Sequence, residues 1–210
     1  AEGALEGAKD VIAEIIADNP AFRKWIRDDT YKRGMIKSVV KDEEKDEKNI
    51  FEMYYEFEEA VEKIVPHRIL ALNRGEKEGV LRVSVKADAD RILGYMERQV
   101  IKGSTVCEAI LKEAVEDGYK RLIQPSIERE IRNELTDKAE DQAIHIFSEN
   151  LRNLLLQPPL KGKMVLGVDP AYRTGCKFAV VDQTGKMLEI GVVYPHPPVS
   201  KRKEATQKIL

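Results

Sequence analysis

The 210-residue sequence has few aromatic side chains, two cysteines, three histidines and no long apolar run. Aromatic residues make up 6% of the chain while 42% of it is hydrophobic, so any core must be mainly aliphatic. Cys107 and Cys176 lie far apart, and neither belongs to a CxxC pair or lies near a histidine. This pattern favours buried thiols in a reducing compartment over a disulfide or a metal site.

No apolar run approaches the ~20 residues that a bilayer-spanning helix needs, and the N-terminus lacks a signal-peptide pattern. We therefore predict a soluble, cytoplasmic protein with no membrane partner. The formal net charge of −2 argues against purely electrostatic binding of nucleic acid. The charge is uneven, however, because residues 1–65 are net acidic and residues 66–102 are net basic. The chain also begins without Met and stops where a helix is predicted to open, so we expect a piece of a longer protein.

Most of the first 123 residues are predicted to be helical. Apolar residues three and four apart predict a helix over 4–18, and Pro20 begins the next. Pro66 begins another helix, which we expect Gly75 to end. Asp88 is predicted to cap a helix running to about residue 100.

Three further local patterns complete this region. Thr105 and Glu108 have capping-box spacing, which predicts one more helix, to about residue 116. Short strands are predicted over 35–40 and 80–86. Trp25 lies at helical spacing among apolar residues, which favours a core position over a base-stacking platform. The large side chains between Phe51 and Phe57 are flanked by glutamates, so we expect packing there too.

The longest helical pattern runs from Ser126 to Leu156 without glycine or proline. At 1.5 Å per residue it spans roughly 46 Å, which is the length of a spine rather than of a packed helix in a small domain. His145 lies in this run with Asp141 as its sole neighbour at ligand spacing, so we predict no metal site and no cofactor. Prolines after Gln157 end the spine.

Residues 164–196 differ in kind from the rest, because they alternate apolar runs with turn residues. We predict a three-stranded antiparallel meander over 165–169, 176–181 and 187–194. Asp169, followed by Pro170, places one carboxylate at the end of the first strand. Such an acid can be a metal ligand or can simply mark the end of the strand.

Val165 to Gly175 resembles the opening of RNase H-like domains, including RuvC-type resolvases and the YqgF domain, with Ala171 where that family usually has glycine. In nucleases of this type, an acid on the first strand joins later acids to hold two divalent cations. A wider likeness covers nearly the whole chain, which resembles the Tex family of bacterial transcription accessory proteins. It is carried by Ala1–Ala4, Pro66–Arg68, Leu70–Gly79, Arg121–Glu130, Asn150–Arg152 and Gly167–Gly175.

The resemblance implies a mainly α fold with a truncated C-terminal α/β portion of RNase H type. We expect a helical region with a small β element over 1–123, a long linking helix over 124–160, and the beginning of a YqgF domain over 164–210. It also implies a non-catalytic nucleic-acid-binding scaffold that acts on RNA or DNA with the transcription machinery. The alternatives are a truncated metal-dependent nuclease and a protein-binding helical adaptor.

Two groups of residues carry these functional expectations. Asp169 is expected to be a vestige of a nuclease site rather than a catalytic residue. For nucleic-acid binding, the basic residues favoured are Arg68, Arg74 and Lys77, followed by Arg173 and Lys177. The arginines after residue 66 have an alternative role, since they could instead pair with the acidic residues 41–62.

Overall fold

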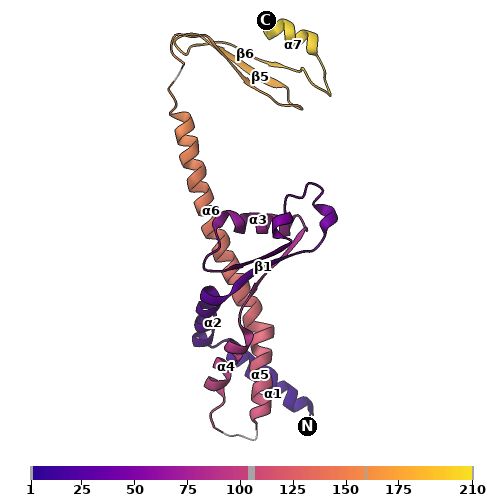
Figure 1. The fold of residues 1–210 in the computed structure, drawn as a ribbon, viewed down its shortest axis with the longest axis vertical. Coiled ribbons are helices and arrows are strands. Elements are labelled where there is room, and N and C mark those ends of the chain that lie inside the picture. Colours follow the sequence, from indigo (N-terminus) through magenta and orange to yellow (C-terminus); the bar gives the residue numbers. More distant parts are fainter. Residues whose placement is uncertain (1, 104–106, 159, 210) are drawn as a thin grey trace. The chain divides into compact units, whose positions relative to one another are not determined.

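A computed structural model of the chain describes residues 2–103, 107–158 and 160–209, and divides into two compact units (Figure 1). Unit 1 is Ala1–Asn150 and unit 2 is Leu151–Leu210. The chain is mostly helical, with two small antiparallel sheets, one in each unit. The fold class expected from the sequence is therefore confirmed. Among the described residues, none of the helices has the length and apolarity required to span a bilayer.

Two of the first four helices of unit 1 begin at a residue whose side chain caps the helix. The helices of the unit before residue 103 are α1 (Glu2–Ala17), α2 (Pro20–Arg33), α3 (Pro66–Lys77) and α4 (Ala89–Val100). The Asn19 side chain accepts a hydrogen bond from the Ala21 N–H at 2.9 Å and caps α2. The Asp88 side chain accepts one from the Arg91 N–H at 3.0 Å and caps α4, as predicted.

The expected end of α3 is wrong. Gly75 lies inside the helix and is buried, and a Cβ there would lie 2.5 Å from Leu81 Cδ1. Gly75 therefore has no side chain because Leu81 packs directly against its backbone. The helix ends after Lys77, and Gly79, with φ +79°, adopts the left-handed conformation that closes it.

The sheet of unit 1 has the strand order β2-β1-β3 and is antiparallel. Its strands are β1 (Met35–Val40), β2 (Glu56–Ala60) and β3 (Leu81–Lys86), and short 3-10 turns cover Glu43–Lys45 and Glu52–Tyr54. The predicted strands β1 and β3 are confirmed, whereas β2 was missed. Its glutamates disfavour a strand locally, but Glu58 lies opposite Lys37 and pairs with it at 3.0 Å.

One continuous helix of 48 residues follows, formed by α5 (Glu108–Asp117), a π-helical segment (Gly118–Ile123) and α6 (Gln124–Leu155). The sequence predicted one helix ending near residue 116 and a separate one over 124–160, and this separation is wrong. Proline usually interrupts a helix, because it lacks an N–H and its ring clashes with the preceding turn. Here the preceding turns are π-helical and therefore wider, which lets Pro125 lie inside the helix. Thr105, the predicted cap of α5, and Pro159, part of the predicted stop after α6, lie outside the described residues.

The core of unit 1 is aliphatic, as the composition predicts, with a few large aromatics among it. Leu72 and Ile92 are fully buried, and every fourth residue of α6 from Ile127 to Ala139 packs into the same cluster. Trp25 packs against this cluster and stacks on Tyr95, with ring centroids 3.8 Å apart. Phe51 and Tyr54 are buried, which confirms packing for this segment, although Met53 is exposed.

Unit 2 contains the predicted meander in the order β4-β5-β6. The elements are β4 (Val165–Asp169), β5 (Cys176–Val181), β6 (Met187–Val193) and α7 (Arg202–Ile209). A small core joins Cys176, Phe178 and Val193 to Ala205 of α7. Cys176 is thus a buried free thiol, while Cys107 is exposed.

Candidate nucleic-acid interface

Two of the basic residues favoured from the sequence are engaged in ion pairs. Arg68 Nη1 donates to Glu59 Oε2 at 2.7 Å, and its guanidinium lies 5.8 Å from the centre of the Phe57 ring. Arg74 Nε donates to Glu78 Oε1 at 2.8 Å. For Arg68 the structure shows the pairing with the acidic segment 41–62 that the sequence left open, and Arg74 pairs within its own helix. Neither carries a surplus positive charge.

Lys77, by contrast, lines an open groove of about 530 Å³ between α3 and α6. The two helices are tied together there, because Asn73 Nδ2 on α3 donates to Thr136 Oγ1 on α6 at 2.8 Å. The groove is lined by Asn73, Glu76, Lys77, Pro125, Glu128, Arg129, Arg132, Asn133 and Thr136.

The two acids of this groove are occupied by structural partners. Glu76 accepts hydrogen bonds from Arg132 and from the Val83 N–H. Burial alone would raise the pKa of Glu76, but the two hydrogen bonds and the positive charges of Arg132 and Lys41 together lower it below its ordinary value. Glu128 accepts a hydrogen bond from the Val85 N–H at 2.8 Å. Both acids therefore cover the outer edge of β3, with which no strand of the described residues pairs.

A second pair of hollows, of about 380 and 160 Å³, lies between α2 and α6. Arg27 on α2 pairs there with both Glu130 and Glu134 of α6. Lys138 also donates to Glu134, and this hydrogen bond is the main reason that the pKa of Glu134 is lowered. The residues that line these hollows are Pro20, Arg23, Lys24, Arg27, Asp28, Tyr31, Lys32, Ile127, Glu130, Glu134 and Lys138.

Together the hollows on the two sides of α6 are lined by eight basic and five acidic side chains. Each acid has a partner within unit 1, including Asp28, which lies 3.6 Å from Arg27. Among the described residues, five of the cations have no acidic partner: Arg23, Lys24, Lys32, Lys77 and Arg129. Arg23 instead donates to the Ser126 hydroxyl at 2.7 Å.

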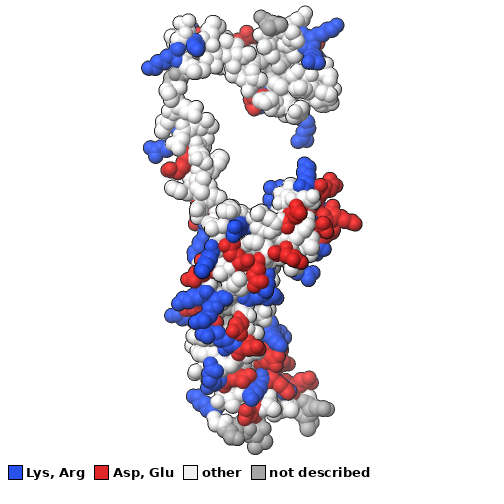
Figure 2. Space-filling model, in the orientation of Figure 1, with Lys and Arg blue, Asp and Glu red and all other residues white. Residues whose placement is uncertain are grey.

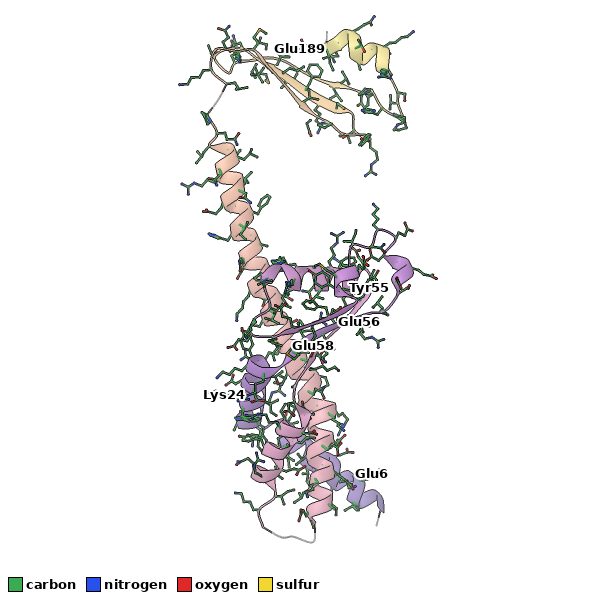
Figure 3. All side chains as sticks on the ribbon, viewed as in Figure 1. Glu6, Lys24, Tyr55, Glu56, Glu58 and Glu189 are labelled. Atoms are coloured by element: carbon green, nitrogen blue, oxygen red, sulfur yellow. The ribbon has the colours of Figure 1, made fainter. Side chains whose placement is uncertain are left out.

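We call these five residues the α6 face. In Figure 2, basic side chains gather along the flank of unit 1 over α2 and α6, and in Figure 3 Lys24 projects from the outer side of α2. Of the five, only Lys77 was selected from the sequence. The spacing of Arg129, Arg132, Asn133 and Thr136, three and four apart, could have indicated a polar stripe on α6, but its free charges depend on tertiary pairing.

The remaining predicted residues lie in unit 2 and are exposed. Asp169 at the end of β4 is the register partner of Lys177 on β5, and Arg173 lies in the turn between these strands. Among the residues that the structure describes, no three His, Cys, Asp or Glu side chains come together as a metal site would require. The structure brings Asp169 and Lys177 onto one side of the sheet of unit 2.

Comparison with protein families supplies the identity of the region. Residues 1–147 match the family described as Tex central region-like, and residues 163–210 match the Tex protein YqgF-like domain. The chain belongs to the Tex family. The resemblance inferred from the sequence is confirmed, and the two matches end and begin on either side of the last turns of α6 and the loop that follows it.

Three relatives show how much of a Tex-family protein is present. YdcI of Bacillus subtilis, an uncharacterized protein, is 64% identical over 99% of this chain and 29% of its own length. Transcriptional accessory protein Tex of Neisseria gonorrhoeae is 34% identical over 93% of this chain and 27% of its own. Human S1 RNA-binding domain-containing protein 1 is 35% identical over 90% of this chain and 20% of its own. The chain thus spans less than a third of each relative.

Proposed function

We propose that this Tex-family region is a non-catalytic module that binds nucleic acid through the α6 face. The observation that carries the proposal is the division of charge around α6. Every acid there has a structural partner, whereas five cations have no acidic partner among the residues that the structure describes. Cations that are not neutralised by the protein can neutralise phosphates and release the counterions condensed on them.

The names of two relatives also support nucleic-acid binding. One is called a transcriptional accessory protein and another an S1 RNA-binding domain-containing protein. We therefore propose RNA or DNA, together with the transcription machinery, as the partners of this region. Arg173 and Lys177 stay a separate prediction of nucleic-acid contacts for unit 2.

Charge reversal on the α6 face tests the proposal. The intact chain and a Lys24→Glu, Lys77→Glu, Arg129→Glu variant are titrated against fluorescein-labelled RNA and DNA over a salt series. If each residue contacts one phosphate, the slope of log K against log salt should become shallower by about 2 to 3. The decisive comparison is with unchanged protein in the same buffers.

A matched control carries the same change of net charge elsewhere in the molecule. Lys48, Lys63 and Lys102 are exposed and have no ion pair among the described residues, and they lie outside the hollows around α6. The control with these three lysines changed to Glu should keep most of the slope. Equal losses in both variants would mean that net charge alone governs binding, and a salt-independent affinity would favour the protein-binding adaptor.

We also propose that Asp169 is not a working metal ligand in this chain. Its nearest cross-strand neighbour is a lysine, and the described residues around it supply no second and third acid. Phosphodiester cleavage by two metal ions needs several acids that converge on both ions. Asp169 would then act only to end β4 before Pro170.

A further inference from the structure

Two large aromatic rings are exposed among the residues that the structure describes. Tyr172, in the turn between β4 and β5, is 76% exposed, and Phe147 on α6 is 65% exposed. The other phenylalanines and tyrosines and the one tryptophan are buried or half-buried. An exposed ring gains free energy when a partner covers it. The surroundings of each ring therefore indicate what kind of partner it fits.

The surroundings of the two rings differ in chemistry. Phe147 has the exposed apolar side chains of Ile144 and Ile146 as neighbours on its helix, which suits packing against protein. Tyr172 lies instead beside the ring of His196, with 5.3 Å between the two ring centres, and His196 is also exposed. Tyr172 thus belongs to a polar aromatic surface rather than to an apolar one.

The fold of unit 2 brings two segments of the chain together around this ring pair. β4 and β6 both run antiparallel to β5, so the turn after β4 and the loop after β6 lie at the same end of the sheet (Figure 1). The Lys201 N–H donates to the Tyr194 carbonyl oxygen at 2.7 Å, which holds the loop against the end of β6. We call residues 169–178 and 194–204 together the Tyr172 end.

The Tyr172 end is basic, because its two segments contain five Lys and Arg residues and two acids. Each acid lies beside one of the cations. Asp169 is the register partner of Lys177, and Glu204 pairs with Lys201 at 3.1 Å. Among the described residues, the other three cations have no acidic partner: Arg173, Arg202 and Lys203.

The stability of α7 does not account for this charge. Arg202 and Lys203 lie in the first turn of α7, where the helix dipole disfavours cations. An anion bound there would offset the repulsion. The same surface therefore presents an exposed aromatic ring and cations that the described part of the protein does not neutralise.

We infer that the Tyr172 end binds single-stranded nucleic acid, with a base stacked on the Tyr172 ring and phosphates on the cations beside it. This second site lies in unit 2 and does not depend on the α6 face. Proteins bind single strands through exposed aromatic rings combined with cations, because every unpaired base has a face free for stacking. In a duplex both faces of a base are covered by its neighbours, so a ring on a surface turn reaches neither.

The test uses the chain that carries Lys24→Glu, Lys77→Glu and Arg129→Glu, in which binding by the α6 face is weakened. The probe is an oligothymidine of about 10 nucleotides, a length within the usual range of single-strand sites, with 2-aminopurine at its centre. We expect the protein to quench this fluorescence by stacking. Tyr172→Ala should weaken the affinity by about 5- to 150-fold, which is the contribution of stacking one base.

Two control variants separate stacking from other effects of the substitution. Tyr172→Phe keeps the ring and should retain the quenching and most of the affinity. Phe147→Ala removes the other exposed ring and should change neither. Equal losses from Tyr172→Ala and Phe147→Ala, or no loss from Tyr172→Ala, would overturn the stacking site.

The cations are tested by the salt dependence of binding to the same oligonucleotide. Arg173→Gln with Arg202→Gln should make the slope of log K against log salt shallower by about 1.4, if each residue contacts one phosphate of the single strand. Lys163→Gln with Lys186→Gln is the matched control, because both lysines are exposed and precede β4 and β6 at the opposite end of the sheet. Equal changes in the two slopes would contradict a site at the Tyr172 end.

The remaining outcomes separate this inference from the proposed function. Duplex DNA with the same number of phosphates that competes as well as the single strand would overturn the preference for single strands. Binding by the unchanged chain but not by the charge-reversed chain would overturn the Tyr172 site, favour a protein partner for this ring, and leave the α6 face intact. Failure of the unchanged chain to bind any nucleic acid would overturn the proposed function as well.

Discussion

Arg132 of α6 and Glu76 of α3 form an ion pair that also closes the outer edge of the sheet of unit 1. Glu76 accepts from the Val83 N–H at 3.2 Å, and Arg132 Nη1 lies 3.3 Å from the Val83 carbonyl oxygen, to which it donates. Side chains from two helices thus satisfy backbone groups that an unpaired strand would otherwise expose. The pair fixes α3 against α6, and with it the groove that contains Lys77 and Arg129.

Removal of this carboxylate should therefore destabilise unit 1. Glu76→Ala removes the acidic partner of Arg132 and the acceptor of the Val83 N–H, which we expect to lower the free energy of unfolding by about 1–3 kcal/mol. Urea unfolding followed by Trp25 fluorescence reports on this unit. Glu78→Ala is the control, because it breaks only the exposed pair with Arg74 and should cost about 0–0.5 kcal/mol. Equal costs for the two variants would contradict the edge-closing role of Glu76.

The packing of Gly75 gives a second prediction. A Cβ at this position would lie 2.5 Å from Leu81 Cδ1 and 3.0 Å from Phe51 Cδ1, both buried. Gly75→Ala should destabilise by about 1–3 kcal/mol through overpacking, although alanine favours a helix. Gly94→Ala on α4 is the matched control, since its Cβ would meet only Arg98 Nη1 at 3.4 Å. It should stabilise by about 0.5–1 kcal/mol, and an equal gain from Gly75→Ala would refute the packing role.

Gly75 and Pro125 show what sequence patterns could and could not predict. Long apolar periods, prolines at helix starts and the Asp88 cap are local signals, and they placed most helices, β1, β3 and the meander. The residue types that end a helix are ambiguous signals, however. A glycine can end a helix as a C-cap, or it can lie inside a helix where another side chain packs too closely for a Cβ. The long helix was expected to begin near residue 124, yet Pro125 lies inside a continuous helix directly after the π-helical turns.

The candidate site was less predictable than the fold, for a physical reason. Whether a surface arginine is available to phosphate depends on the acids that tertiary structure brings near it. Arg68 and Glu59 lie on different elements, and their ion pair requires β2, which the sequence did not reveal. Arg129 has no acidic partner among the described residues, because the two acids nearest to it in the groove, Glu76 and Glu128, bind the edge of β3 instead.

The loop before β2 should be sensitive to acid. Asp46 is 4% exposed, and its carboxylate accepts hydrogen bonds from the Ile50 and Phe51 N–H groups and from the Tyr55 hydroxyl. Burial would raise the pKa of Asp46, but these hydrogen bonds outweigh it and lower the pKa below its ordinary 3.8. A lowered folded-state pKa adds stability that is present above the ordinary value and is lost as pH falls through the folded value.

Asp46→Asn should therefore lower the stability of unit 1 at neutral pH and reduce its loss on acidification below about pH 4. Urea unfolding by Trp25 fluorescence at a series of pH values measures both effects. Asp42→Asn, which removes only an exposed pair with Lys45, should leave the acid dependence nearly unchanged. An unaltered pH profile for Asp46→Asn would show that another group controls the acid response.

The relationship between Asp169 and Lys177 leads to the last prediction. The two residues are register partners on β4 and β5, so their side chains leave the sheet on the same side. A lysine beside the first-strand acid would oppose the binding of divalent cations there by repulsion. The intact chain with Mg²⁺ or Mn²⁺ should therefore leave branched DNA and RNA uncut in a gel assay, and Asp169→Asn should behave identically. Cleavage by the intact chain that Asp169→Asn abolishes, with circular dichroism unchanged, would establish the nuclease instead.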